Sequence, residues 1–325
     1  MSGLADIWIA ILSGALVCAA TGLAMAAVRT PLIARLRKVQ PALRAAILLA
    51  VITAPLAMAL ATATFIALSS HGTAIDLVPH HCHVNAAGCV PHTPATPTPM
   101  LSLFAGGLLT AVLIWVPLMV GVGFVRMARA LRLLRQASER HGDAAERVLG
   151  TETPVALASG LLRPQLFLSR GLLLHLDAGE LAIVRTHEES HARRFDNLAR
   201  LLASALSLGH TPRSVRALRQ ELVLAQEQAC DRIAADRFGA VETAETLLKV
   251  ERLIDTWSAE ACHGAAFVDA PATARVKALV APDFAPLKRN AAWFAATLLA
   301  ASAGIFLVAE PLHHEVETLI LILQG

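Results

Sequence analysis

Residues 187 to 191 form a five-residue motif, His187-Glu188-Glu189-Ser190-His191, that follows the HExxH pattern. On a helix, positions i and i+4 share one face, so the His187 and His191 imidazoles can bind one metal ion while Glu188 lies beside its open coordination position. A chain of this composition contains such a motif by chance in roughly 2% of cases. The motif therefore predicts a zinc hydrolase only if the surrounding sequence supports it.

Apolar residues recur at helical spacing on both sides of the motif, at Leu181 and Val184 before it and at Phe195 and Leu198 after it. This period predicts a single helix of about 25 residues that carries both histidines. A carboxylate commonly completes a catalytic zinc site that contains two histidines. The third ligand must then come from another segment.

A second helical stretch, Glu221–Asp236, offers Glu227 and Asp231 at positions i and i+4. One of these carboxylates can bind the metal, while the other accepts a hydrogen bond from a ligand imidazole. The sequence thus predicts one metal site built from two helices.

The ordered set of motifs resembles the BlaR/MecR-type antirepressor family of membrane-embedded gluzincin peptidases. The segments that carry the resemblance are Ser159–Ser169, His187–Asn197 (HEESHARRFDN), Glu227–Asp231 (EQACD) and Arg275–Leu279. The resemblance extends over residues 100 to 310, and the set is far more specific than HExxH alone.

This resemblance implies a Zn²⁺ site with three protein ligands, which are His187, His191 and Glu227. It also implies that Glu188 is the general base, and that Asp231 and Asp196 hold the ligand side chains from behind. Peptidases of this kind often use a tyrosine to stabilise the oxyanion, but the chain contains no Tyr. A His or Arg must replace it, or the metal acts alone. His210 and His263 are nearest in sequence, but neither is assigned, since a lone histidine is more often a packed residue.

A short hairpin is predicted ahead of the zinc helix. Its strands are Pro154–Leu157 and Gln165–Leu168, joined through Ser159-Gly160. An exposed strand edge beside the metal could hold an extended peptide substrate by backbone pairing.

The composition predicts a membrane protein. Hydrophobic residues make up 55% of the chain, charged residues 16%, and the mean hydropathy is +0.57, a balance that a soluble domain could hardly cover with polar surface. Four uncharged stretches are long enough to cross a bilayer. They are residues 7–28, 45–70, 101–125 and 290–309.

The Lys and Arg residues beside these stretches predict the orientation. They are Arg29, Arg35, Arg37, Lys38 and Arg44 after the first stretch, Arg126, Arg129, Arg132 and Arg135 after the third, and Lys288 and Arg289 before the fourth. Residues 1–6, 71–100 and 310–325 contain no Lys or Arg. The positive-inside rule then predicts that both termini lie outside and that residues 126–289 are cytoplasmic. Met1–Trp8 lacks the basic residues of a cleaved signal peptide, so the first span should be retained.

The net charge of +3 does not predict nucleic-acid binding, because the basic residues cluster beside the spans, where anionic membrane lipids account for them. Met127–Arg147 is expected to continue from the third span as a basic helix along the membrane surface. A solvated helix is the alternative.

The predicted outer loop, residues 71–100, combines histidines with two cysteines. The residues concerned are His80, His81, Cys82, His83, Cys89 and His92. Imidazole and thiolate could bind copper or zinc at this outer face, or Cys82 and Cys89 could form a disulfide. Both alternatives stay open.

We therefore expect a mainly α, four-span protein of the bacterial inner membrane, with spans 1 to 3 in residues 1–125 and span 4 with a short outer tail in residues 290–325. A cytoplasmic α+β zincin-like metallopeptidase domain, residues 126–289, separates spans 3 and 4. By resemblance, its substrate is a cytoplasmic DNA-binding repressor. We do not expect beta-lactam sensing, because only residues 310–325 follow the last predicted span, where the family has a penicillin-binding sensor domain. The alternatives are a quality-control protease and a non-catalytic metal-binding sensor or transport accessory.

Overall fold

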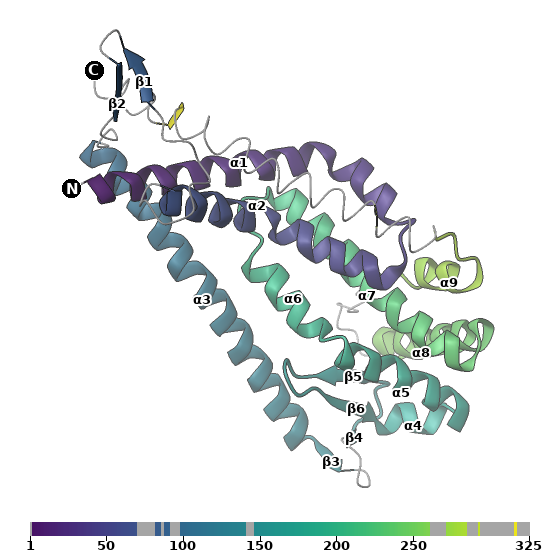
Figure 1. Cartoon of the computed structure of the whole chain (residues 1–325). Helices are drawn as coiled ribbons and strands as arrows, with labels where there is room; N and C mark the ends of the chain where they lie inside the picture. The colour runs from purple at the N-terminus through teal and green to yellow at the C-terminus, as the bar shows by residue number, and fades with distance from the viewer. Residues whose placement is uncertain are drawn as a thin grey trace.

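The computed structural model describes residues 2–69, 82–85, 88–91, 98–140, 146–260, 271–284, 292 and 315–316. The described chain is mainly helical, with a small mixed sheet and a two-stranded hairpin (Figure 1). The helices are α1 (Ser2–Leu36), α2 (Pro41–Ser69), α3 (Pro99–Gln136), α4 (Arg170–His175), α5 (Ala178–Arg193), α6 (Asp196–Ala205), α7 (Pro212–Phe238), α8 (Ala240–Glu260) and α9 (Ala272–Val280). The strands are β1 (Cys82–Asn85), β2 (Gly88–Pro91), β3 (Ser138–Arg140), β4 (Glu146–Leu149), β5 (Ala156–Ser159) and β6 (Gln165–Ser169).

Three helices are long and apolar enough to cross a membrane, in the segments Ile7–Leu36, Pro41–Ala67 and Pro99–Gln136. They correspond to the first three predicted spans, which are confirmed in length and composition. The fourth predicted span, residues 290–309, lies outside the described residues except for residue 292.

Helices α1 and α2 form an antiparallel hairpin that lies against α7 (Figure 1). Their contact with the later helices is apolar, because Leu36, Leu48 and Ile52 of the hairpin share one buried cluster with Leu218 and Leu222 of α7. Burial of such side chains is the main favourable contribution to packing. The hairpin and α7 therefore belong to one core.

The turn that joins α6 to α7 packs closely against this hairpin. Gly209 has φ +88, and a Cβ there would lie 2.6 Å from the Cys18 sulfur. A Cβ at Gly22 of α1 would in turn collide with the Gly209 carbonyl oxygen. Next to it, the His210 Nε2 lies 3.2 and 3.1 Å from the carbonyl oxygens of two successive α2 residues, Val51 and Ile52. The Val51 carbonyl needs such a donor because Pro55, four residues on, has no N–H.

Helix α3 diverges from the hairpin (Figure 1) and runs without a break to Gln136. The basic helix predicted over 127–147 is thus confirmed to residue 136 and wrong beyond it. Ser138–Arg140 and Glu146–Leu149 form antiparallel strands instead, with Ser138 opposite Leu149. The pairing and the hydrogen bond from Arg147 Nε to Ser138 Oγ (2.8 Å) override the local helical pattern.

The small sheet has the strand order β3-β4-β6-β5, in which β4 and β6 are parallel and the other pairs antiparallel. The predicted hairpin is confirmed, since β5 pairs with β6 and Leu157 lies opposite Phe167. Its first strand covers residues 156–159 instead of 154–157, so Ser159 belongs to the strand and not to the turn. Phe167 and Leu168 are fully buried, so β6 is the central apolar strand. Strand β5 is left as the edge nearest α5 (Figure 1).

The hairpin of β1 and β2 lies beside the N-terminal end of α1 (Figure 1). The four-stranded sheet lies far from it, at the C-terminal end of α3 (Figure 1). Only the backbone of the β1–β2 hairpin is described. The predicted outer metal or disulfide site therefore lies outside the described side chains and stays a prediction; it comprises His80, His81, Cys82, His83, Cys89 and His92.

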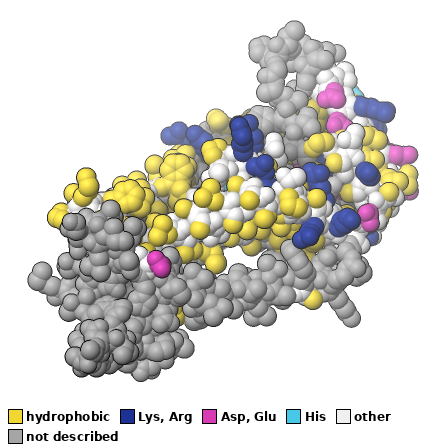
Figure 2. Space-filling view, turned by 90° about the horizontal axis from the view of Figure 1, so that it is seen from above, with side chains coloured by type: hydrophobic (Ala, Val, Ile, Leu, Met, Phe, Trp, Pro, Cys, Tyr) yellow, Lys and Arg dark blue, Asp and Glu magenta, His cyan; other side chains and the backbone are white. Residues whose placement is uncertain are grey.

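The surface of the described residues changes from apolar to charged along the molecule. In Figure 2 the described residues on the left are mostly hydrophobic, whereas most of the Lys, Arg, Asp and Glu side chains gather over the middle and the right-hand part. This distribution agrees with a protein whose apolar helices lie in a membrane and whose polar helices lie beside it.

Candidate metal centre

The HExxH motif occupies the last turns of α5. The helix begins with a capping box, in which the Glu180 N–H donates to Asp177 Oδ1 (2.9 Å) and the Asp177 N–H to Glu180 Oε2 (2.8 Å). Such a box satisfies two of the N–H groups that a helix start leaves without partners. Val184 packs into the apolar cluster of β6 and α4. The start and the buried face together fix which way the two histidines point.

The helix that carries the HExxH motif ends earlier than predicted. The single helix of about 25 residues is wrong, because α5 ends at Arg193 and α6 begins at Asp196. Between them Phe195 has φ 54 and ψ 38, a left-handed conformation that costs a residue with a side chain about 1–2 kcal/mol. The turn brings the Asp196 carboxylate back beside His191, with Asp196 Oδ2 2.8 Å from His191 Nδ1.

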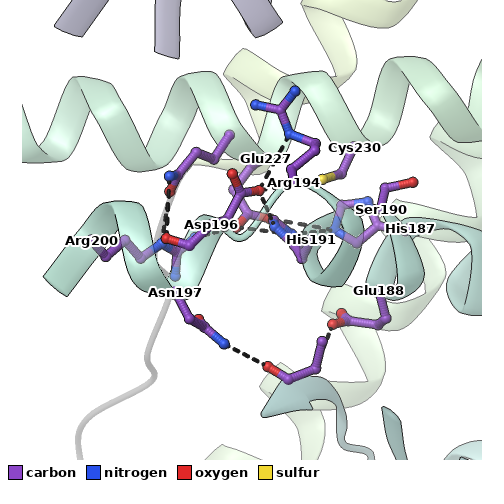
Figure 3. Close-up of polar contacts among 12 residues, drawn as sticks. His187, Glu188, Ser190, His191, Arg194, Asp196, Asn197, Arg200, Glu227 and Cys230 are labelled. Carbon is purple, nitrogen blue, oxygen red and sulfur yellow. Dashed lines mark hydrogen bonds and ion pairs between the residues drawn. The ribbon is translucent and has the colours of Figure 1, made fainter. Parts of the chain in front are cut away.

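Helix α7 brings the third predicted ligand to this pair (Figure 3). Glu227 Oε2 lies 3.5 Å from His187 Nε2, and Glu227 Oε1 lies 3.4 Å from His191 Nε2. The two Nε2 atoms are 3.2 Å apart, and one ligand atom from each of the three residues lies within 4.8 Å of the others. Two imidazoles and a carboxylate in this arrangement are a donor set that fits Zn²⁺. Their role as ligands remains a prediction that the geometry supports.

Both histidines are held from behind by carboxylates. His187 Nδ1 lies 3.0 Å from Asp231 Oδ1, as His191 Nδ1 lies close to Asp196. A carboxylate on Nδ1 favours the tautomer that donates from Nδ1, which leaves the Nε2 lone pair for a metal. Asp231 and Asp196 therefore lie where the resemblance places them, each behind one of the two histidines.

Two arginines for which no role was predicted complete the centre. Arg275 of α9 donates to both oxygens of Asp231 (2.8 and 2.6 Å), and its Nη1 lies 3.5 Å from Glu227 Oε2. Arg200 of α6 donates to Glu227 Oε1 (3.0 Å) and to Gln226 Oε1 (2.8 Å). No local pattern predicted their roles. Arg275 lies in a segment that resembles the family, but the resemblance gave it no role, and Arg200 is notable only for its place one helical turn after Asp196.

The pKa values reflect this mixture of burial and pairing. Burial lowers the pKa of His187, but the hydrogen bonds with Asp231 and Glu227 outweigh burial and raise it above its ordinary value. Burial likewise lowers the pKa of His191, and bonds with Asp196 and other neighbours raise it well above that value. Burial raises the pKa of Glu227, whereas the two histidines lower it well below its usual range. The neighbouring carboxylates thus favour the protonated form of both imidazoles, and a bound cation would compete with those protons.

Glu188 points away from the two imidazoles, toward β5 (Figure 3). Its Oε2 accepts a hydrogen bond from the Ala158 N–H (2.9 Å), and Asn197 Nδ2 donates to the Ala158 carbonyl (3.0 Å) and the Gly160 carbonyl (3.2 Å). The edge strand is therefore tied to the zinc helix and to α6 at a single residue. Asn197, like the two arginines, received no role from the sequence.

A groove of about 390 Å³ runs over this centre. The residues that line it include the three predicted ligands, Glu188 and Arg275, with β5 on one side and α8 on another. Its apolar wall consists of Ile183, Val184, Leu247, Val250 and Ile254. The groove can therefore take an extended peptide with an apolar side chain beside the metal centre.

Of the two histidines considered for the oxyanion, only His210 lies among the described residues, and it does not line this groove. His210 is turned to the α2 backbone, and His263 lies outside the described residues. Arg200 and Arg275 are the cationic side chains that line the groove.

One comparison with known proteins gives a match. A family model described as BlaR1 peptidase M56 matches residues 9–279. The matched region begins in α1 and ends in α9, so it includes the three long helices, the HExxH motif, Glu227 and Arg275. No curated protein and no solved structure matches the chain.

Proposed function

The chain belongs to the BlaR1 peptidase M56 family of membrane-associated metallopeptidases, and from this premise we propose that it is a zinc endopeptidase that cleaves a cytoplasmic repressor protein. The observation that carries the zinc assignment is the convergence of His187, His191 and Glu227 within 4.8 Å. Glu188, the next residue of the motif, lines the same groove. A purely structural metal site needs no carboxylate beside an open position.

Each residue has one task in this proposal. His187, His191 and Glu227 would hold the zinc ion, which when bound would supply a Lewis acid and would lower the pKa of a water molecule to about 7. Glu188 takes the proton of the attacking water and passes it to the leaving amine. Asp231 and Asp196 keep the His187 and His191 rings in the orientation that presents Nε2.

Substrate is held at the edge of the sheet. Strand β5 lines the groove, and an extended peptide can add to such an edge by backbone hydrogen bonds. Because Ala158 already bonds to Glu188 and Asn197, Ala156 offers the nearest outward backbone groups on the same side of the strand.

The proposed setting is the bacterial inner membrane. Four spans, with both termini outside, would put the peptidase domain, residues 126–289, at the cytoplasmic face beside the anionic lipid headgroups. The three long apolar helices support the membrane setting. The repressor as substrate rests on the family alone.

The test is a comparison of newly formed protein N-termini in cells that carry the wild-type chain or Glu188→Gln. The variant should keep its metal, measured on the purified protein, and lose cleavage by a factor of at least 100. New termini in one DNA-binding repressor, seen only with the wild type, would support the proposal. Termini from many membrane proteins would favour quality control instead, and identical termini in both cells would favour a non-catalytic metal-binding role.

A further inference from the structure

The turn end of the α1–α2 hairpin is bonded to α7 at two points. Arg37, in the turn of the hairpin, forms an ion pair with Glu221, and Arg44, in the first turn of α2, donates to Gln228 Oε1. Glu221 and Gln228 are two helical turns apart and so lie on one face of α7. The two contacts are similar in kind, but they differ in burial and in the further hydrogen bonds of the α7 residue.

Arg44 is buried to an extent that is unusual for a guanidinium. The residue is 2% exposed, and its Nε has no hydrogen-bond partner within the described part of the chain. Burial of a charged group is costly unless its hydrogen bonds are fully satisfied. An apolar side chain of similar volume would suit this position at least as well if packing were its only purpose.

Gln228 connects Arg44 to α9. Its carbonyl oxygen accepts from Arg44, while its Nε2 donates to the Ala274 carbonyl (2.9 Å). Gln228 is 7% exposed, so both ends of its amide are used inside the core. Reversal of the amide would break both bonds, since the oxygen would face a carbonyl and the NH₂ a guanidinium.

The connection continues from Ala274 to the metal centre. The next residue, Arg275, grips Asp231 with two hydrogen bonds, and Asp231 holds His187 Nδ1. Gln228 itself directly follows Glu227 in α7. Arg44 is thus connected to the predicted ligand His187 by hydrogen bonds and by one peptide bond, that between Ala274 and Arg275. Through Gln228 it also contacts the residue next to the predicted ligand Glu227.

We propose that Arg44 is a positioning residue of the metal site: through Gln228 it holds α7 and α9 in the register that presents Glu227 and His187 to the metal. The first turn of the second membrane helix thereby determines the geometry of the site. This inference rests on the proposed metallopeptidase function.

Arg37 provides a matched control. It comes from the same hairpin and contacts the same face of α7, but its side chain is 60% exposed, and the bonds of Glu221 within the described residues are those with Arg37. Loss of the Arg37 contact should weaken the packing of the hairpin on α7. It should not disturb the metal ligands, because no series of hydrogen bonds leads from the Glu221 side chain to them among the described residues.

The experiment uses the full chain in detergent micelles, loaded with Co²⁺, whose visible absorption depends on the geometry of its ligands. Arg44→Met removes the guanidinium at similar volume. Gln228→Glu keeps an acceptor for Arg44 but removes the donor to Ala274, so it breaks the relay even if Arg44→Met fails to fold. We expect both variants to change the Co²⁺ spectrum and to weaken Zn²⁺ binding, measured by chelator competition, by about 10-fold or more. Arg44→Lys should recover part of the loss, and Arg37→Met should match the wild type.

Two results would overturn the proposal. One is a wild-type spectrum and affinity in folded Arg44→Met and Gln228→Glu; the other is an equal loss in Arg37→Met, which would make the effect one of general docking. A failure of the proposed function looks different. In that case the wild-type chain binds no metal, or His187→Ala binds it equally well, and both proposals fall together.

Discussion

The three long apolar helices of this molecule divide into two regions that differ in their relation to the peptidase helices. In their most apolar windows, 44% of α2 and 28% of α1 are buried within the described structure, but none of α3 is. The α1–α2 hairpin shares a core with α7, whereas α3 exposes Leu103, Leu113 and Phe124 along its length. An apolar helix with an open surface suits contact with lipid. The hairpin is therefore part of the peptidase fold, whereas α3 contacts α6 and the sheet but keeps its most apolar part open.

The largest expected difference between the two regions comes from leucine truncation. Leu48 of α2 is fully buried against α7, and Leu113 of α3 is 63% exposed. Leu48→Ala should lower the free energy of unfolding by about 2–5 kcal/mol, because it leaves a cavity in the shared core. Leu113→Ala should change it by less than about 0.5 kcal/mol. Denaturant unfolding in one detergent measures both, and equal losses would show that the two regions do not differ.

Substitution of a glycine by alanine, which adds a methyl group instead of removing side-chain atoms, should give a smaller difference in stability between the two regions. A Cβ at Gly22 of α1 would meet the Gly209 carbonyl, whereas a Cβ at Gly121 of α3 has nothing within 4 Å. Gly22→Ala should then destabilise the protein by about 1–3 kcal/mol through overpacking. Gly121→Ala should be neutral or slightly stabilising, by at most about 1 kcal/mol, since alanine favours the helix. Melting temperatures of the two variants are the readout, and a tolerated Gly22→Ala would contradict the close approach of the α6–α7 turn to α1.

The smallest effect is expected where α3 contacts the sheet. Arg135 Nε donates to Gln165 Oε1 (2.8 Å) at an exposed position. Removal of this bond by Arg135→Ala should cost about 0.5–1 kcal/mol and leave metal binding unchanged. A loss of metal after this substitution would mean that α3 also supports the site, and the contrast between the two regions would be less sharp than the burial suggests.

The parts of the site that were predictable are those with a local period. His187, His191, Glu227 and Asp231 follow helical i, i+4 spacing, and the β5–β6 hairpin follows from short apolar runs around Gly160. Each helical pair is contained in one helix, and the hairpin joins two strands that are neighbours in the chain, so the local sequence is enough to place them.

The unpredicted parts depend on contacts between distant segments or on a single backbone conformation. Arg275 reaches Asp231 from α9, and Asn197 reaches Ala158 of β5 from α6. The break at Phe195 interrupts an apolar period that reads as continuous, and β3 forms only because β4 lies beside it. No periodicity encodes such pairings, since tertiary structure selects them.

The two halves of the metal centre also differ in when they can form as the chain is made. His191 finds Asp196 only five positions later, so this half can assemble as soon as α5 and α6 have been synthesised. His187 depends on Asp231, and Asp231 is gripped by Arg275, the last of these residues to leave the ribosome. By then all three long helices are complete. The order of the residues along the chain therefore delays a fully supported site until synthesis has passed residue 275.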